Sequence, residues 1–136
     1  MSLLRKWIEG LRSGRYKQVQ NLLRTEKGYC ADGVLCDVSE LGKWQENYGT
    51  TFWYKIRDYQ TSVVFPLILY AILKQENCVV QIPIELLTPQ QKERLTWRHR
   101  AGKGINTFTL NDAGFSFAEI ADLLEKANPE IVSQEE

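Results

Sequence analysis

Large apolar residues recur at helical spacing in the first stretch of the chain. SLLRKWIEGLRSG places four of them on one face, with Ser2 positioned to cap a helix and Gly14 positioned to stop it: Leu4, Trp7, Ile8 and Leu11. The same pattern continues in RYKQVQNLLR, residues 15–24. The spacing therefore predicts a first helix and, after a tight corner at Ser13–Gly14, a short second helix.

A third apolar stripe lies in GYCADGVLCDVSELGKW, residues 28–44, and consists of Ala31, Val34, Leu35, Val38 and Leu41. It predicts a third helix, because the spacing outweighs the cost of Gly33, about 1 kcal/mol relative to alanine inside a helix. Gly42 is the expected end of this helix.

The pattern changes in the middle of the chain. TTFWYKIRDYQTSVVF, residues 50–65, is rich in aromatic and β-branched residues with partial alternation, which predicts one or two strands or an extended segment. In PLILYAILKQEN, residues 66–77, Pro66 suits the first turn of a buried helix, and continued extended chain is the alternative. CVVQIPI, residues 78–84, predicts a short strand.

Signals for helix starts return in the last third. Thr88 is placed to cap and Pro89 to take the first helical position, so a helix is predicted from about Pro89 to Arg98. GINTFTL, residues 104–110, predicts extended chain. In SFAEIADLLEKA, Ser116 and Glu119 form a capping box before an apolar stripe, which predicts a C-terminal helix.

Together these elements predict an α+β fold. A length of 136 residues suits one domain, and no repeat, low-complexity tract or linker divides the chain. We expect a helical N-terminal part, short strands or extended chain in the middle, and a C-terminal amphipathic helix that seals the core. The domain is predicted to span residues 1–136, and disorder of about the last eight residues is left open.

The string LNDAGFSFAEIADLLE, residues 110–125, is similar to the first helix of a DNA-reading helix-turn-helix. Such a reader needs a second helix after a short turn, with donors for base edges in its first residues. The residues that follow here, NPEIVSQEE, are few and acidic, so they would repel phosphate. We therefore predict a structural helix and no sequence-specific DNA binding.

The apolar and cysteine patterns argue against several classes of protein. The longest apolar run, Val63 to Leu73, is far shorter than the roughly 20 residues of a membrane span, and the first residues lack the pattern of a secretory signal. We therefore expect a cytoplasmic protein with no membrane partner.

Cys30, Cys36 and Cys78 form neither a CxxC pair nor a cluster with histidines. This pattern predicts buried or half-buried thiols, and it predicts neither a metal site nor a cofactor.

The formal net charge is zero, yet the charges are unevenly distributed. Cations dominate residues 1–30 and anions dominate residues 111–136, so the two ends are expected to attract one another. A second basic group, KERLTWRHRAGKG, lies between them with five lysines and arginines against one acid, Glu93.

Two blocks of the chain, LRSGRYKQVQNLLRTEKGYCADGVLCDVSE and TLNDAGFSFAEIADLLE, resemble a loosely defined group of small uncharacterised proteins encoded by bacteria and their phages. The blocks span residues 11–40 and 109–125. The group more often has a double cysteine followed by an apolar residue where this chain has Cys30-Ala31-Asp32. The resemblance implies a bacterial or viral cytoplasmic setting and brings no activity with it.

The second basic group is the best candidate for a ligand site. Guanidinium groups beside the glycine-flanked AGKG loop suit a phosphate or a nucleotide. The alternative is a solvated helix end whose cations favour the carbonyl pole. The candidate residues are Arg94, Trp97, Arg98, His99, Arg100 and Lys103.

Three acids and an Asn-Asp pair are weaker candidates. On a helix Asp32 and Asp37 point in different directions, so we predict capping or solvent-facing roles for them and for Glu40 instead of catalysis. The pair Asn111-Asp112 is predicted to make turn hydrogen bonds to nearby backbone.

The aromatic cluster YGTTFWYKIRDY suits an exposed partner surface as well as it suits a core, because tyrosine and tryptophan dominate binding hot spots. Its candidate surface residues are Trp53, Tyr54 and Tyr59.

No nucleophile, base and orienting group converge in this sequence, so no catalytic residue is assigned. The favoured function is a small non-enzymatic binding, inhibitor or accessory protein of bacterial or phage type, with a protein or a small anionic ligand as its partner. The alternatives are a nucleotide or phosphorylated small-molecule binder that uses the Arg98–Lys103 region, and an unrecognised enzyme. A deep pocket lined by Arg98, His99 and Arg100 would favour the nucleotide, and a flat aromatic patch would favour the protein partner. The sequence leaves the oligomeric state open.

Overall fold

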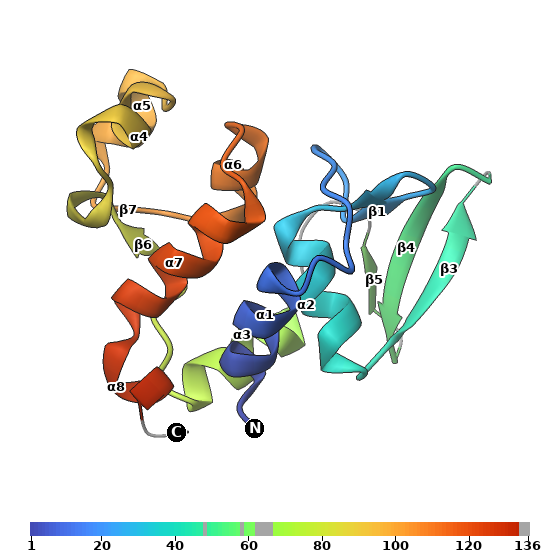
Figure 1. Ribbon diagram of the computed structural model, residues 1–136. Coiled ribbons are helices and arrows are strands. Elements are labelled where there is room, and N and C mark those ends of the chain that lie inside the picture. Colours follow the sequence, from blue (N-terminus) through green and yellow to red (C-terminus); the bar gives the residue numbers. More distant parts are fainter. Residues whose placement is uncertain (48, 58, 62–66, 134–136) are drawn as a thin grey trace.

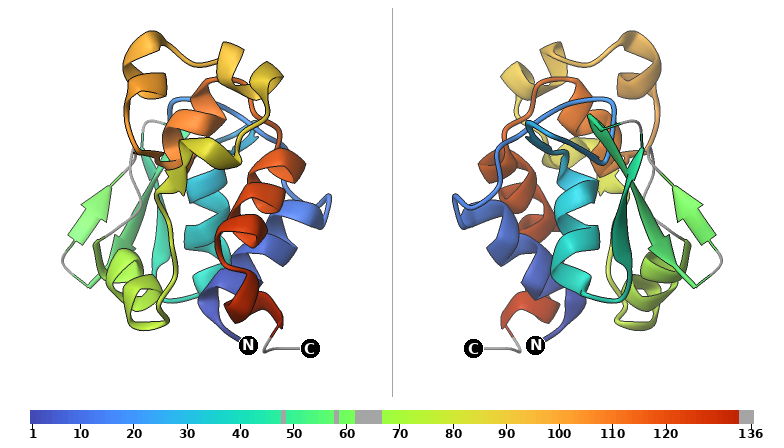
Figure 2. Two further views of the ribbon diagram at one scale, coloured as in Figure 1. Left: turned by 90° about the vertical axis from the view of Figure 1, so that its left-hand side faces the viewer. Right: turned by 90° about the vertical axis from the view of Figure 1, so that its right-hand side faces the viewer.

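Helix α1 (Leu3–Arg12) packs between α2 (Ala31–Ser39) and α7 (Phe117–Ala127), so segments from both ends of the chain lie side by side (Figures 1 and 2). The computed structural model describes residues 1–47, 49–57, 59–61 and 67–133. Trp7 is fully buried in this helical layer, and its indole Nε1 donates to the Ala31 carbonyl at 2.9 Å. The predicted first and C-terminal helices are confirmed, including the Ser116–Glu119 capping box.

The expected attraction between the basic and acidic ends is confirmed where α1 meets α7. The Arg12 guanidinium donates to Asp122 at 2.5 Å and to Glu125 at 2.8 Å. All three side chains are substantially exposed, so the pairs orient the two helices more than they stabilise them.

A small antiparallel sheet lies on the other side of α2 from α7 (Figure 1). Its strands run in the order β2-β1-β4-β3, and β5 also pairs with β4. Lys43 is opposite Lys55 and Asn47 opposite Thr51 in the β3–β4 ladder. The strands predicted in residues 50–65 are confirmed by β4 and β5, whereas residues 62–65 lie outside the described part. The bounds are β1 (Arg24–Thr25), β2 (Gly28–Tyr29), β3 (Lys43–Asn47), β4 (Thr51–Ile56) and β5 (Tyr59–Thr61).

The next segment contains helix α3 (Leu67–Gln75), which decides between the two alternatives in favour of a helix. Pro66, the expected first-turn residue, lies outside the described residues. The strand predicted in residues 78–84 is confirmed at β6 (Ile82–Pro83), which pairs with β7 (Gly104–Ile105). A single 3₁₀ turn, Ile84–Leu86, follows β6.

The predicted second helix, residues 15–24, is wrong, because tertiary partners take the hydrogen bonds that a helix would use. The Val19 amide donates to the Tyr29 carbonyl at 2.9 Å, and the Tyr29 amide donates to the Lys17 carbonyl at 2.8 Å. The Gln18 side chain donates to the Phe115 carbonyl and accepts from the Phe117 amide. The apolar spacing in this stretch is real, but the backbone is irregular until β1.

The predicted third helix is confirmed as α2, but it ends earlier than Gly42. Its C-cap is Glu40, an exposed residue with φ of 56°, and Leu41 is 52% exposed, so it does not continue the buried stripe. The strand β3 begins at Lys43, directly after Gly42, the predicted end of the helix.

Gly33 is required by packing despite its cost in a helix. A Cβ atom at this position would lie 1.9 Å from the carbonyl oxygen of Leu23. Glycine therefore lets the irregular segment between α1 and β1, residues 13–23 and called the N-terminal loop below, approach the first turn of α2.

Two predictions near the end of the chain need correction. The helix expected from Pro89 to Arg98 is two short helices, α4 (Pro89–Glu93) and α5 (Trp97–Ala101), because Thr96 caps a new helix. The extended chain expected over residues 104–110 is present only as β7. Asn106 accepts from the Thr109 amide at 2.8 Å and starts α6 (Thr107–Asp112), and this N-cap signal outweighs the β-branched residues that follow it.

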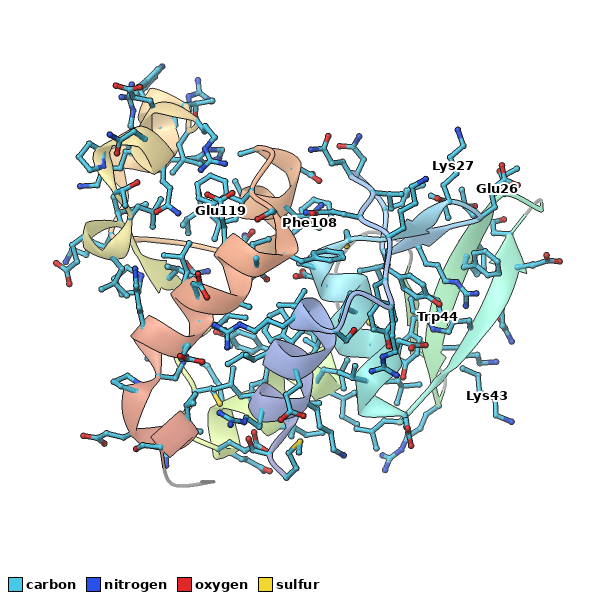
Figure 3. The ribbon with its side chains drawn as sticks, in the orientation of Figure 1. Glu26, Lys27, Lys43, Trp44, Phe108 and Glu119 are labelled. Atoms are coloured by element: carbon cyan, nitrogen blue, oxygen red, sulfur yellow. The ribbon has the colours of Figure 1, made fainter. Side chains whose placement is uncertain are left out.

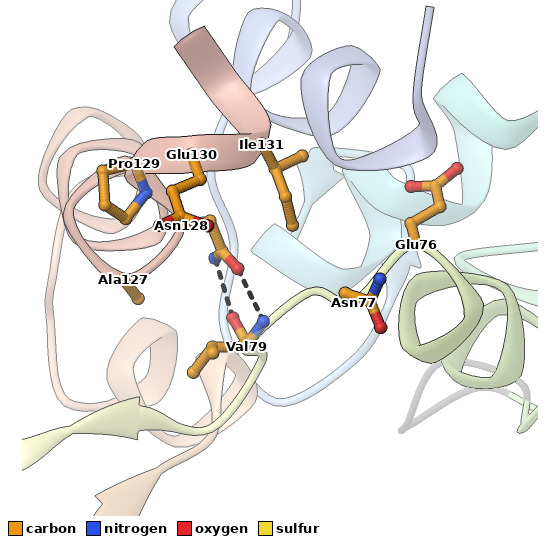
Figure 4. A pocket seen from close by; sticks show the side chains of 8 residues that line it. All are labelled: Glu76, Asn77, Val79, Ala127, Asn128, Pro129, Glu130 and Ile131. Atoms are coloured by element: carbon orange, nitrogen blue, oxygen red, sulfur yellow. Dashed lines mark hydrogen bonds between the residues drawn. The ribbon is translucent and has the colours of Figure 1, made fainter. Parts of the chain in front are cut away.

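Hydrogen bonds of the Asn128 side chain stabilise the junction between α7 and α8 (Pro129–Ser133). The buried Asn128 amide accepts from the Val79 backbone N–H at 2.6 Å and donates to its carbonyl at 2.9 Å, as Figure 4 shows. A cavity of about 380 Å³ lies beside these hydrogen bonds. Glu76, on its wall, accepts from the backbone amides of Leu3 and Leu4 and so caps α1. We interpret this cavity as a gap in the packing between helices and not as a ligand site.

The elements form a single α+β domain, as predicted, with the core between the helices and the inner face of the sheet. Every helix in the described ranges is too short or too polar to cross a lipid bilayer.

Replacing Leu123 with alanine is predicted to lower the free energy of unfolding by about 2–5 kcal/mol, because this α7 side chain is 1% exposed. Urea denaturation measures the loss. The matched control is Lys126→Ala on the exposed face of the same helix, which should change the stability by less than about 0.5 kcal/mol. Equal, small losses in both variants would contradict the buried position of Leu123.

Candidate functional site

The α4–α5 projection, residues 88–103, extends away from the helical layer (Figures 1 and 2). Neither of its helices has a buried residue, and every residue from Thr96 to Lys103 is exposed. Trp97 is 69% exposed. Leu95 is the buried side chain that anchors the projection. The projection therefore presents a tryptophan and several cations without contributing much to the core.

Arg94 is separated from the other candidate cations, because it faces the body of the protein. Its guanidinium makes a two-pronged ion pair with Glu119 of α7 and lies 4.3 Å from the ring centroid of Phe115. The ion pair lowers the pKa of Glu119 to about 2. Figure 3 places Glu119 beneath the projection. Arg94 therefore fastens the projection to α7 and is not part of its free basic surface.

The remaining candidate residues lie together on α5 and the loop after it: Trp97, Arg98, His99, Arg100 and Lys103. The backbone around the two glycines is largely engaged in the fold. The Gly102 amide donates to the His99 carbonyl, and Gly104 pairs with Pro83. The AGKG loop is thus a connection into β7, and the Lys103 carbonyl in it accepts from the Ile84 amide at 3.1 Å.

A cavity of about 380 Å³ lies next to α5, lined by Arg94, Thr96, His99, Phe108, Thr109, Asp112 and Ala113. This lining does not include Arg98, Arg100 or Lys103. It contains the carboxylate of Asp112, which opposes binding of a phosphate. The basic side chains therefore face open surface.

The aromatic candidates are divided between core and surface. Tyr54 is 1% exposed, and its hydroxyl accepts from the Gly42 amide at 2.7 Å, so it belongs to the core. Trp53 is half-buried on β4. The side chain of Tyr59 lies outside the described residues. Of the two candidates whose side chains are described, only Trp53 reaches the surface of the sheet.

Asp37 is held by aromatic residues, so the prediction of a solvent-facing role is wrong for it. The Tyr16 hydroxyl donates to its carboxylate at 2.5 Å, and the Trp44 indole donates at 3.0 Å. Both donors come from segments that pack on α2. Asp37 and its partners therefore join α2 to the N-terminal loop and to β3.

An aromatic cage surrounds Arg24 on the sheet. Its guanidinium carbon lies 4.1 Å from the ring centroid of Phe52 and about 5 Å from those of Tyr29 and Trp44. Figure 3 shows Trp44 among the strands. Such stacking stabilises a cation within the sheet. Arg24, one of the basic residues near the N-terminus, therefore has a structural role that requires no ligand.

Asp32 is buried, at 1% exposure, so the prediction of a capping or solvent-facing role is wrong here too. The Thr107 hydroxyl donates to Asp32 Oδ1 at 2.6 Å. Burial raises the pKa of the Asp32 carboxyl to about 7, against the opposing effect of the Thr107 hydrogen bond. The prediction that Asp32 and Asp37 do not converge is confirmed, because they contact different elements.

The sequence does contain a signal for the burial of Asp32. Leu35 and Cys36 follow it by three and four residues, and both are fully buried, so Asp32 lies on the apolar face of α2. A carboxyl group on such a face is unusual and marks a candidate site.

A cavity of about 280 Å³, the Asp32 cavity, lies against this carboxyl group. Its lining comes from α2, α3, the segment before β6, and the start of α6. Phe108 lines both the Asp32 cavity and the cavity beside α5. The lining residues are Asp32, Leu67, Tyr70, Val80, Gln81, Asn106, Thr107 and Phe108.

Asn111 and Asp112 bond to backbone as predicted, but their partners are distant in the sequence. The buried Asn111 amide donates to the Val19 carbonyl at 2.8 Å and accepts from the Ala31 amide at 3.0 Å. Asp112 accepts from the Asn21 amide at 2.8 Å. The pair therefore joins the α6 end to the N-terminal loop instead of forming a local turn.

The thiols are buried or half-buried, as predicted. Burial raises the pKa of the Cys30 thiol to about 12, and burial together with nearby Asp32 raises that of Cys36 well above its usual value. His99 is exposed on α5, whereas both of these thiols are inside. Across the described residues, no three His, Cys, Asp or Glu side chains come together in a way that could hold a metal ion.

Comparison with known protein families gives a match. Residues 2–128 match the family described as Domain of unknown function (DUF8296). The chain belongs to this family. The match includes α1 through α7, and with them the α4–α5 projection and every residue of the Asp32 cavity. Neither the curated proteins nor the solved structures contain a match to the chain.

The protein is predicted to become less stable as the pH rises from about 5 to about 8. The pKa of Asp32 is about 7 in the folded protein, and that of an aspartate in an unfolded chain is about 3.9. The folded state therefore holds more protons than the unfolded state in this interval, so the free energy of unfolding falls as the pH rises. The expected fall is roughly 3 kcal/mol, at about 1.4 kcal/mol for each of the roughly two pH units between a pH of about 5 and the folded pKa.

Urea denaturation at several pH values measures this slope, and Asp32→Asn, which cannot titrate, should flatten it. Glu119 is no source of the slope, because its lowered pKa matters only below its unfolded pKa of about 4.3. A slope that is the same in the wild type and in Asp32→Asn would show that another group is responsible.

Proposed function

We propose that this protein is a non-enzymatic accessory protein of bacterial or phage type that binds an acidic surface of a protein partner through the α4–α5 projection. The observation that carries the proposal is that every residue from 96 to 103 is exposed, on a fold whose other apolar residues are mostly packed. An exposed tryptophan beside arginines has the composition of a binding hot spot.

Charge supports an acidic partner. Between Trp97 and Lys103 the chain has two arginines, one histidine and one lysine, and no acid. Arg98 also lies 5.4 Å from the Trp97 ring centroid, which keeps cation and ring together as one contact surface. Such a surface would attract an acidic partner at a distance, with an attraction that weakens as salt is added.

The cavity beside α5 supports a protein partner more than a nucleotide. Its Arg94 is already paired with Glu119, and Asp112 adds negative charge to its wall. A bound phosphate would have to compete with one carboxylate and lie near the other. The exposed cations, by contrast, are available to a broad, flat partner.

The test uses the partner that the wild-type protein retains in cells carrying its gene, purified and titrated by calorimetry. Arg98→Glu combined with Arg100→Glu should weaken binding by at least about tenfold, or about 1.4 kcal/mol, and so should Trp97→Ala. The matched control is Lys43→Glu combined with Lys55→Glu, which makes the same change in net charge on the exposed side of the sheet (Lys43 in Figure 3) and should leave the Kd within about twofold.

Equal weakening by both double variants would mean that only the overall charge matters, and unchanged binding in the projection variants would place the interface elsewhere. The alternative, nucleotide binding, is tested separately by measuring thermal shifts with nucleotides and with inorganic phosphate at millimolar concentrations. Stabilisation that is lost in Arg98→Ala combined with Arg100→Ala would replace the protein-partner proposal with nucleotide binding.

No sequence-specific duplex DNA binding is expected from α6 and α7. The helix after α7 is α8, a five-residue helix whose first turn contains Glu130 and whose Val132 is buried against the body of the protein. It offers no row of donors for base edges. A footprinting assay at low salt should show no protected site, and a defined footprint would contradict the structural role assigned to α7.

A further inference from the structure

The Asp32 cavity combines a buried acid with apolar and aromatic walls. The hydrogen-bonded pair of Asp32 and Thr107 is part of its lining, and so is Leu67, which is 73% exposed. Tyr70 and Phe108 are half-buried in the wall. A small, mostly apolar pocket with a few polar groups is the usual form of a small-molecule site.

Within the described part of the chain, the Asp32 carboxylate has no ion-pair partner. Thr107 supplies a hydrogen bond to Oδ1, but a hydroxyl carries no positive charge. Among the residues that the structure describes, no lysine, arginine or histidine lines this cavity. A buried carboxylate in such surroundings is costly, and a cation with N–H donors would offset that cost.

We propose that the Asp32 cavity binds a small organic amine, whose ammonium group donates to the Asp32 carboxylate and whose apolar part lies against Phe108 and Tyr70. The volume of about 280 Å³ restricts the ligand to a small molecule. Anionic ligands are disfavoured because they would face an acid with no cation beside it. The two aromatic rings favour a ligand with a ring or a short alkyl chain next to its charge.

The test compares three probes that share one ring and differ in charge: 2-phenylethylamine, phenylacetamide and phenylacetate. Each is titrated against the full chain at a pH of about 8, where Asp32 is mostly ionised, with binding followed by calorimetry. The amine should bind at least about tenfold more tightly than the amide, and the acetate should not bind at millimolar concentrations.

Asp32→Asn should weaken binding of the amine by at least about tenfold, with folding checked by circular dichroism. A second pair of variants avoids any effect on the core, because Gln81 lines the cavity and is exposed. Gln81→Lys should weaken binding of the amine and Gln81→Glu should strengthen it, by several-fold in opposite directions.

Three results would overturn the proposal. The first is no binding of the amine at millimolar concentrations to the folded protein. The second is binding of the amide as tight as that of the amine, which would make Asp32 a neutral hydrogen-bond donor to a carbonyl ligand. The third is an amine affinity that neither Asp32→Asn nor the two Gln81 variants change.

Discussion

The structure depends on the hydrogen bonds that the buried Asn111 side chain makes to segments far away in the sequence. Its amide group donates to the Val19 carbonyl, and its oxygen accepts from the Ala31 amide and from the Gln18 side chain. One side chain thereby satisfies backbone groups of an irregular loop and of the first turn of α2. Such groups would be costly if they were buried without partners, so the N-terminal loop and α6 are held in place together.

The same junction creates the Asp32 cavity. Asn111 and Thr107 lie one helical turn apart on α6, and both bond to the first turn of α2, to Ala31 and Asp32 respectively. With α6 fixed in this position, the Asp32 carboxyl group is shut away from bulk water. Burial raises the pKa of Asp32 and, with it, those of the adjacent thiols Cys30 and Cys36. Burial in the same part of the core is thus the main cause of the raised pKa values of both thiols and of the acid.

Local signals in the sequence predict the elements whose stability is also local. The Ser116 capping box and the α1 stripe are examples, and so are the aromatic strands β4 and β5. The predictions that are wrong concern segments whose conformation is decided by a partner distant in the chain. Residues 15–24 have helical spacing, but their backbone groups bond to Tyr29 and to the side chains of Asn111 and Asp112 at the end of α6. The basic residues around α5 were identifiable as a group, but the separate role of Arg94 depends on Glu119, which no spacing within the group reveals.

The two candidate sites share a physical property: each has a residue that the fold would not need for packing. A leucine or an asparagine in place of Asp32 would avoid the cost of a buried charge, and a polar residue in place of Trp97 would avoid an exposed indole. The rest of the core follows the ordinary rules of burial and hydrogen bonding, and the described residues include no buried side-chain nitrogen or oxygen without a partner. Departures from those rules in an otherwise consistent structure are expected where a protein binds something. Because one departure is a buried acid and the other an exposed basic and aromatic surface, they suit ligands of opposite charge, and they are best understood as two separate sites.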